Sequence, residues 1–179
     1  TNPSGKLPTT FPMKLDDTPA YSHYPGENLQ MDYLEEIYVG YRWYEKEKIK
    51  PLFPFGFGLS YTNFEYSNLR IIPPKKEDSA IAFSVTVSNT GDVQGKEVVQ
   101  CYVGVQNSSV ERALKELKKF SKVDLNSGES KELIFELSER DLSYWNEDEK
   151  SWSVEPAEYK IYVGGCSDDT PLEASAWLG

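Results

Sequence analysis

Short stretches of alternating apolar and polar residues, separated by turn-forming residues, dominate the chain from residue 66 to its end. Apolar residues alternate with small or polar ones from Ile81 to Val87, the pattern of a strand buried on one face. Further strands are predicted over residues 64–72, 96–105, 115–125, 131–137 and 159–163, with turns at 89–92 and 126–129. Six or seven short strands over 66–179 predict a mainly β fold, an immunoglobulin-like or fibronectin type III-like sandwich.

The first 65 residues lack this pattern and hold seven of the eleven prolines. Prolines recurring between residues 3 and 25 prevent regular structure there. One helix is predicted over residues 32–47, with Asp32 as its N-cap, although Gly40 weakens it. Its apolar face would consist of Leu34, Ile37, Tyr38, Tyr41 and Tyr44.

The aromatic residues between 51 and 61 need a surface to pack on, because so short a segment cannot enclose a core of its own. Residues 1–65 are therefore interpreted as the remnant of a larger domain, or as a strap that lies on one. The sequence thus predicts two parts, residues 1–65 and residues 66–179.

The chain is acidic, with 19 basic and 29 acidic residues and a formal net charge of −10. Such a surface repels phosphate backbones and anionic lipids, which argues against nucleic acid and membrane partners. No apolar run reaches the roughly 18 residues of a membrane-spanning helix. Hydrophobic residues make up 39% of the chain, enough for a packed core.

Cysteine usage is low, and both cysteines lie in apolar, strand-like runs. Cys101 and Cys166 are predicted to be buried free thiols, since neither has a partner at CxxC spacing. The lack of a disulfide framework favours a cytoplasmic bacterial setting, while export of a longer parent protein stays open.

No group of residues with catalytic or ligand-binding spacing emerges. The single histidine, His23, lies in a proline-flanked loop, so neither a metal site nor a catalytic triad is predicted. Nucleotide-binding glycine motifs are also lacking, and no cofactor is predicted. Adjacent acidic residues occur at 16–17, 35–36, 147–149 and 168–169. They are interpreted as solvated residues or as a helix start, and no catalytic residue is assigned.

The tryptophans have two interpretations. Trp145 and Trp152 flank a charged turn over 146–150, Trp43 lies in the predicted helix, and Trp177 lies near the end. Core packing, or an interface with a missing domain, is the first interpretation, and a sugar-stacking platform is the second. The triplet 107–109 matches a glycosylation acceptor, a pattern that also arises by chance.

Several runs of the chain are distinctive, namely NPSGKLPTTFP at 2–12, YVGYRWY at 38–44, PLFPFGFGLSYT at 51–62, GKEVVQCYV at 95–103, KELKKF at 115–120 and VGGCS at 163–167. They resemble the C-terminal part of glycoside hydrolase family 3 enzymes such as β-glucosidases. The run at 51–62 is the most specific of these, and the resemblance covers nearly the whole chain. Glu36 and Lys119 replace glycines common in the family, and Ala113 replaces a proline, changes that affect local turns only.

The resemblance implies that residues 1–65 end an α/β sandwich domain and that residues 66–179 form a fibronectin type III-like domain. It implies a parent that hydrolyses β-glucosides or related glycosides by the retaining route. The family's nucleophile lies on a barrel domain and its acid/base residue lies upstream in the α/β sandwich, so neither maps onto this chain. The barrel and the α/β sandwich are the implied partners, and the isolated chain is expected to be inactive.

Three functions remain open at this point. The chain is expected to be a non-catalytic structural module of the hydrolase. The alternatives are a module that binds carbohydrate or protein through exposed aromatic residues, and one chain of a split β-glycosidase.

Overall fold

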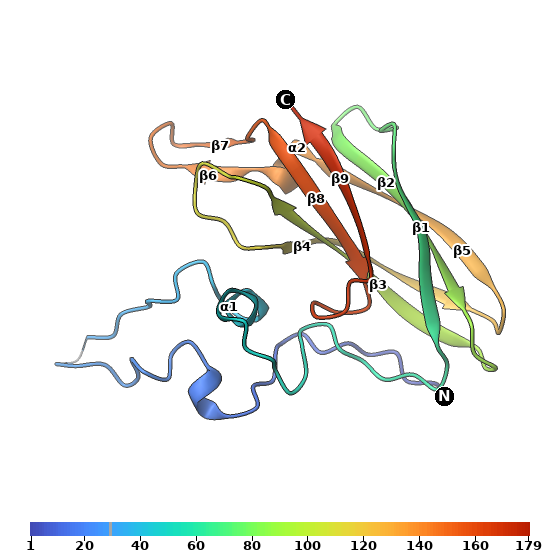
Figure 1. Ribbon diagram of the computed structural model, residues 1–179, viewed down its shortest axis with the longest axis horizontal. Coiled ribbons are helices and arrows are strands. Elements are labelled where there is room, and N and C mark those ends of the chain that lie inside the picture. Colours follow the sequence, from blue (N-terminus) through green and yellow to red (C-terminus); the bar gives the residue numbers. More distant parts are fainter. Residues whose placement is uncertain (29) are drawn as a thin grey trace.

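Two antiparallel sheets form the main body of the protein. The computed structural model describes residues 1–28 and 30–179. One sheet has the strand order β1-β2-β5 and the other the order β4-β3-β8-β9. Figure 1 shows the sheets facing each other as two layers. The strands are β1 (Phe64–Ile72), β2 (Ser79–Asn89), β3 (Gly95–Val105), β4 (Glu116–Leu125), β5 (Ser130–Ser138), β8 (Ala157–Gly164) and β9 (Leu172–Leu178). The predicted mainly β sandwich is confirmed.

The core lies between the two layers. Phe83 of β2 and Phe135 of β5 stack with their ring centroids 5.5 Å apart, and both face buried residues of the opposite sheet. Burying one such side chain contributes about 1.5–3 kcal/mol. The apolar residues that alternate from Ile81 to Val87 in the sequence all lie in this core. Its opposite half includes Val99, Cys101, Leu125, Tyr159, Ile161 and Val163.

Two small elements connect β5 to β8. Ser138 caps helix α2 (Glu139–Leu142). Its hydroxyl accepts a hydrogen bond from the backbone N–H of Asp141, and the Asp141 carboxylate accepts one from the backbone N–H of Ser138. A hairpin of β6 (Tyr144–Asn146) and β7 (Ser151–Ser153) follows. It pairs Trp145 directly opposite Trp152. The predicted turn between the two tryptophans is confirmed.

The N-terminal segment is irregular, as predicted from its prolines. It contains a short 3₁₀ turn, η1 (Leu15–Asp17), and one helix, α1 (Tyr41–Glu47). Two extended runs lie antiparallel, joined where Leu7 donates to Phe57 O and Phe11 donates to Phe53 O, both at 2.8 Å. Between these runs the chain reaches away from the sandwich (Figure 1).

The helix predicted over residues 32–47 is wrong in its first half. Helix α1 begins only at Tyr41, with Gly40 as its N-cap, and Asp32 caps nothing. Glu36 has φ of +49° and Gly40 has φ of +63°, values that interrupt a right-handed helix. Residues 34–37 form turns instead. Leu34 remains 59% exposed, because it lies on no helix face.

Candidate functional site

The central part of strand β3, residues 99–104, is buried on both of its faces. Val99, Cys101 and Val103 point into the sandwich core, yet Gln100 and Tyr102, which point outward, are equally buried. The cover comes from residues 1–61, which we call the strap. Contacts between the strap and the outer face of the β4-β3-β8-β9 sheet form what we call the seam. Figure 1 shows the strap passing along this end of the sheet.

Gln100 fixes the strap at the middle of the seam. Its amide nitrogen donates to the carbonyl of Gly56, 3.2 Å away, and to that of Gly165, 2.5 Å away. Its amide oxygen accepts from the hydroxyl of Tyr102 at 2.6 Å. Gly56 has φ of +81°, and a Cβ at this position would collide with the Gln100 amide. Glycine is therefore required where the strap meets β3.

An aromatic contact from helix α1 extends the seam. The ring of Tyr41 stacks on Phe55 at 5.1 Å and meets the edge of Tyr102 at 5.7 Å. Its hydroxyl accepts a hydrogen bond from the Leu117 backbone N–H at 2.8 Å. Burial raises the pKa of Tyr41 to about 12, so the phenol stays neutral.

Ion pairs cross the seam at several points. Lys6 Nζ lies 2.7 Å from Glu97 Oε1, and both side chains are largely buried. Tyr66 donates to the same oxygen at 2.9 Å, and its pKa is raised by burial and by the charge of Glu97. At the other end Arg42 pairs with Glu116 at 3.2 Å. Opposite charges thus hold the strap in one register on the sheet.

A groove of about 790 Å³ lies between helix α1 and the loop that follows β3. Glu45 lines it, and both oxygens of its carboxylate are buried. Burial raises the pKa of Glu45, the ammonium of Lys115 opposes this, and the charge of Asp168 adds to it. Lys115 Nζ lies 3.3 Å from Oε1. The sequence analysis missed Glu45, since only the fold reveals its burial.

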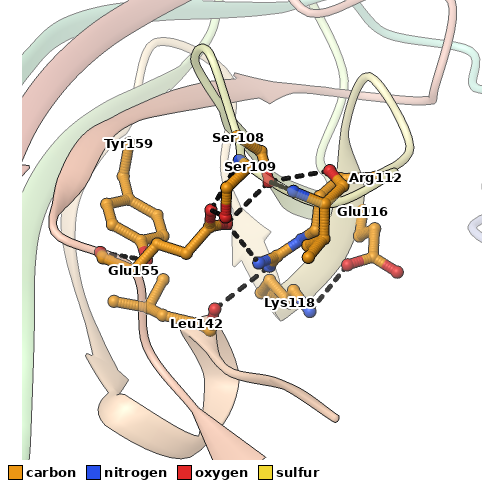
Figure 2. A network of polar contacts seen from close by, with 9 residues as sticks. Ser108, Ser109, Arg112, Glu116, Lys118, Leu142, Glu155 and Tyr159 are labelled. Carbon is orange, nitrogen blue, oxygen red and sulfur yellow. Dashed lines mark hydrogen bonds and ion pairs between the residues drawn. The ribbon is translucent and has the colours of Figure 1, made fainter. Parts of the chain in front are cut away.

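The loop after β3 is fixed by a second buried carboxylate, which Figure 2 shows. Glu155 accepts from Ser108 Oγ at 2.6 Å and from the N–H and hydroxyl of Ser109 at 2.7 Å each. Arg112 lies 3.4 Å from the carboxylate and donates to Leu142 O at 3.1 Å. Burial acts to raise the pKa of Glu155, but the serine hydrogen bonds and Arg112 outweigh it, so the pKa is lowered.

The side of the strap that faces away from the sheet is rich in exposed apolar residues. Among the described residues, 13 of the 21 large apolar side chains that remain exposed belong to the strap. Phe11 and Leu59 border an apolar groove of about 560 Å³ that is lined only by strap residues. Exposed apolar surface of this kind marks sites where a protein contacts a partner. Most exposed are Met13, Leu15, Tyr24, Tyr33, Leu34, Leu59 and Tyr61.

The tryptophans of the sandwich are outside the core, so the core-packing interpretation is wrong for them. Trp145 is 48% exposed, Trp152 is 52% exposed, and Trp177 is 70% exposed. Trp43 is half-buried and donates to Asp17 O at 3.1 Å. Whether a missing domain covers any of them stays a prediction, as does the sugar platform.

The other residues considered from the sequence are dispersed. His23 lies in a turn, and the acidic pairs 16–17, 35–36, 147–149 and 168–169 lie in separate segments. Of these acids, Asp168 lines the groove beside Glu45. Cys101 and Cys166 are buried and free, as predicted. In residues 1–28 and 30–179 no cluster of three metal-ligating side chains occurs.

None of the helices described has the length and apolar character needed to span a bilayer. The assignment of no catalytic residue stays a prediction, as does the division of the chain at residue 65.

Comparisons with known proteins identify relatives of this chain. A family model described as a fibronectin type III-like domain matches residues 97–167. A thermostable β-glucosidase B from Acetivibrio thermocellus is 49% identical over 97% of the chain. The crystal structure of a family 3 (GH3) β-glucosidase from Bifidobacterium adolescentis superimposes with a TM-score of 0.91 at 41% identity over 99% of the chain. A β-glucosidase from Streptomyces venezuelae, solved with D-glucose, also gives 0.91 at 36% identity. The chain spans only 23–26% of these proteins.

Proposed function

Because the chain is the C-terminal part of a glycoside hydrolase family 3 enzyme, fibronectin type III-like domain included, we propose that it acts as a non-catalytic structural module. In this role the outer side of the strap packs against the remaining domains of the parent. The observation that carries the proposal is the exposed apolar surface of the strap, whose other side is fixed to the sheet.

The chemistry of the parent would reside outside this chain. The relatives are named β-glucosidases, so the parent is proposed to hydrolyse β-glucosides or related glycosides. Such hydrolysis needs two carboxyl groups on either side of the scissile bond. Glu45, in the groove beside helix α1, has a pKa raised by burial, but Lys115 holds it in an ion pair. We assign it a structural role.

Geometry explains why this module would stabilise its parent. The seam fixes the backbone of the strap near Lys6, Tyr41 and Gly56. Ordering a segment at an interface costs conformational entropy, and these contacts reduce the part of that cost that falls on docking. The barrel and α/β sandwich domains would then gain apolar contacts at a small entropic cost.

A chimeric enzyme tests this proposal. The matching region of the A. thermocellus relative is replaced by this chain, and Leu15, Tyr33 and Leu59 are changed to Ser singly and together. We expect each change to lower the stability of the chimera by about 1–2 kcal/mol, since each side chain would be buried there. The same changes in the isolated chain are expected to have little effect, because these residues are already exposed.

Ile71→Ser and Ile134→Ser serve as matched controls. Both isoleucines are also partly exposed, at 41% and 47%, but they lie on the β1-β2-β5 sheet, away from the strap. They should affect chimera and isolated chain alike. If the strap substitutions changed the melting temperature of the chimera no more than these controls, the docking role would be refuted.

A further inference from the structure

The hairpin of β6 and β7 carries a pair of exposed indole rings in a fixed arrangement. Trp145 and Trp152 meet edge to face, with ring centroids 5.5 Å apart and an interplanar angle of 68°. The guanidinium of Arg140 lies 3.2 Å from the centre of the Trp152 ring. Cross-strand pairing and this cation–π contact hold both rings while about half of each remains accessible.

The hairpin lies at the end of the sandwich farthest from the strap. Figure 1 shows β6, β7 and the C-terminus at one end and the strap with α1 at the other. If the strap docks on the parent, as the proposed function holds, the hairpin points away from that interface. On that arrangement the rings face away from the docked domains, which leaves them accessible to a ligand.

Charge around the hairpin narrows the choice of occupant. Between residues 139 and 150 there are five acidic and two basic residues, and the chain as a whole carries a net charge of −10. Like charges repel across such a face, which disfavours a second copy and an acidic partner. A neutral ligand with a flat apolar face meets no such penalty.

We propose that the Trp145–Trp152 hairpin is a carbohydrate-stacking site for neutral β-linked glucan chains. The C–H face of a β-linked pyranose packs on an exposed indole, and its hydroxyls reach polar groups at the rim of the rings. Arg140, which lies over the Trp152 ring, supplies donors there. The named activity of the relatives favours glucose polymers over other neutral glycans.

Depletion binding to insoluble cellulose, and affinity electrophoresis in barley β-glucan, test the site with the 179-residue chain. The variants are Trp145→Ala and Trp152→Ala, and Trp177→Ala is the matched control. Trp177 is more exposed than either but lies on β9, outside the hairpin. We expect retention of the wild type and of the control, and a loss of roughly tenfold or more in each hairpin variant. Near-ultraviolet circular dichroism and thermal unfolding show that each variant keeps the sandwich.

Three outcomes would overturn the proposal. They are a wild type that binds neither glucan at millimolar sugar concentration, hairpin variants that bind as well as the wild type, and an equal loss of binding in all three tryptophan variants. A concentration-dependent dimer that Trp145→Ala abolishes would assign the hairpin to a second copy instead. None of these results bears on the strap, so failure here is distinct from failure of the chimera experiment.

Discussion

Individual carboxylates in this protein differ greatly in how many partners they have. Glu155 accepts three short hydrogen bonds and pairs with Arg112, so its charge is well compensated. Among the described residues, Glu45 has one cationic partner, Lys115, for its two buried oxygens. Partner number explains why the pKa of Glu155 is lowered, whereas burial raises the pKa of Glu45.

Replacing Glu155 with Gln should destabilise the chain by about 2–4 kcal/mol at pH 7, because Arg112 would lose the partner of its buried charge. The folded pKa of Glu155 lies below its ordinary value of 4.5. The charge therefore contributes stability above pH 4.5, and this contribution is lost as pH falls through the folded pKa. Urea unfolding at several pH values should show the wild type and Glu155→Gln converging below pH 4.5.

Glu132→Gln is the control for this experiment. Glu132 also pairs with an arginine, Arg70, at 2.7 Å, but both side chains are exposed. Exposed pairs contribute little, so its unfolding free energy should stay close to that of the wild type. Equal losses in both variants would contradict the assigned role of Glu155.

Among the elements, β3 connects the two parts of the chain, since its outward face carries the seam. Gln100→Ala would leave the carbonyls of Gly56 and Gly165 and the hydroxyl of Tyr102 without their partner. We expect the amides that pair the two extended runs of the strap to exchange at least roughly tenfold faster, while the sandwich core stays protected. Hydrogen exchange followed by mass spectrometry measures both regions at once.

Gln94→Ala provides the comparison for that substitution. Its side chain donates to Asp124 at 3.0 Å in an exposed position, while its backbone carbonyl, which accepts from Asn2 of the strap, is kept in the alanine variant. It should leave exchange in the strap unchanged. Faster exchange throughout the sandwich in Gln100→Ala would show that β3 itself has unfolded, and the seam would then have no separate stability.

The bounds of an element were predictable where the spacing of apolar residues follows the face that is buried. The strand predicted over 64–72 matches β1, and the one over 115–125 differs from β4 by one residue. The helix over 32–47 failed because apolar spacing cannot reveal that Glu36 adopts positive φ. The double burial of β3 was also invisible, since the covering strap lies about 40–95 residues away in sequence.

For the whole molecule, the exposed strap should determine how strongly the isolated chain binds apolar molecules in solution. Its ordered but uncovered apolar side chains should bind an apolar fluorescent dye more strongly than the same chain does inside the chimera. Titration of both proteins with such a dye measures the difference. Equal dye binding per molecule would mean that the strap stays uncovered in the whole enzyme.

The sequence indicated which residues needed a packing partner, but not which of their side chains are exposed. The aromatic run at 51–61 indicated that a packing partner was needed, and the structure shows that the sheet supplies one side of it. The tryptophans were first interpreted as core residues or as part of an interface with a missing domain, because sequence does not distinguish an indole in a core from one on a hairpin. Distances and burial were needed to separate the two.

The double cover of β3 limits how this region can be exchanged between enzymes. A cut at residue 65 would expose Gln100 and Tyr102 and leave Glu97 without Lys6. The smallest piece that recombination or protein engineering can transplant intact is therefore the strap together with the sandwich. Exchange of this region as a single block follows from one strand whose central residues, 99–104, are covered on both faces.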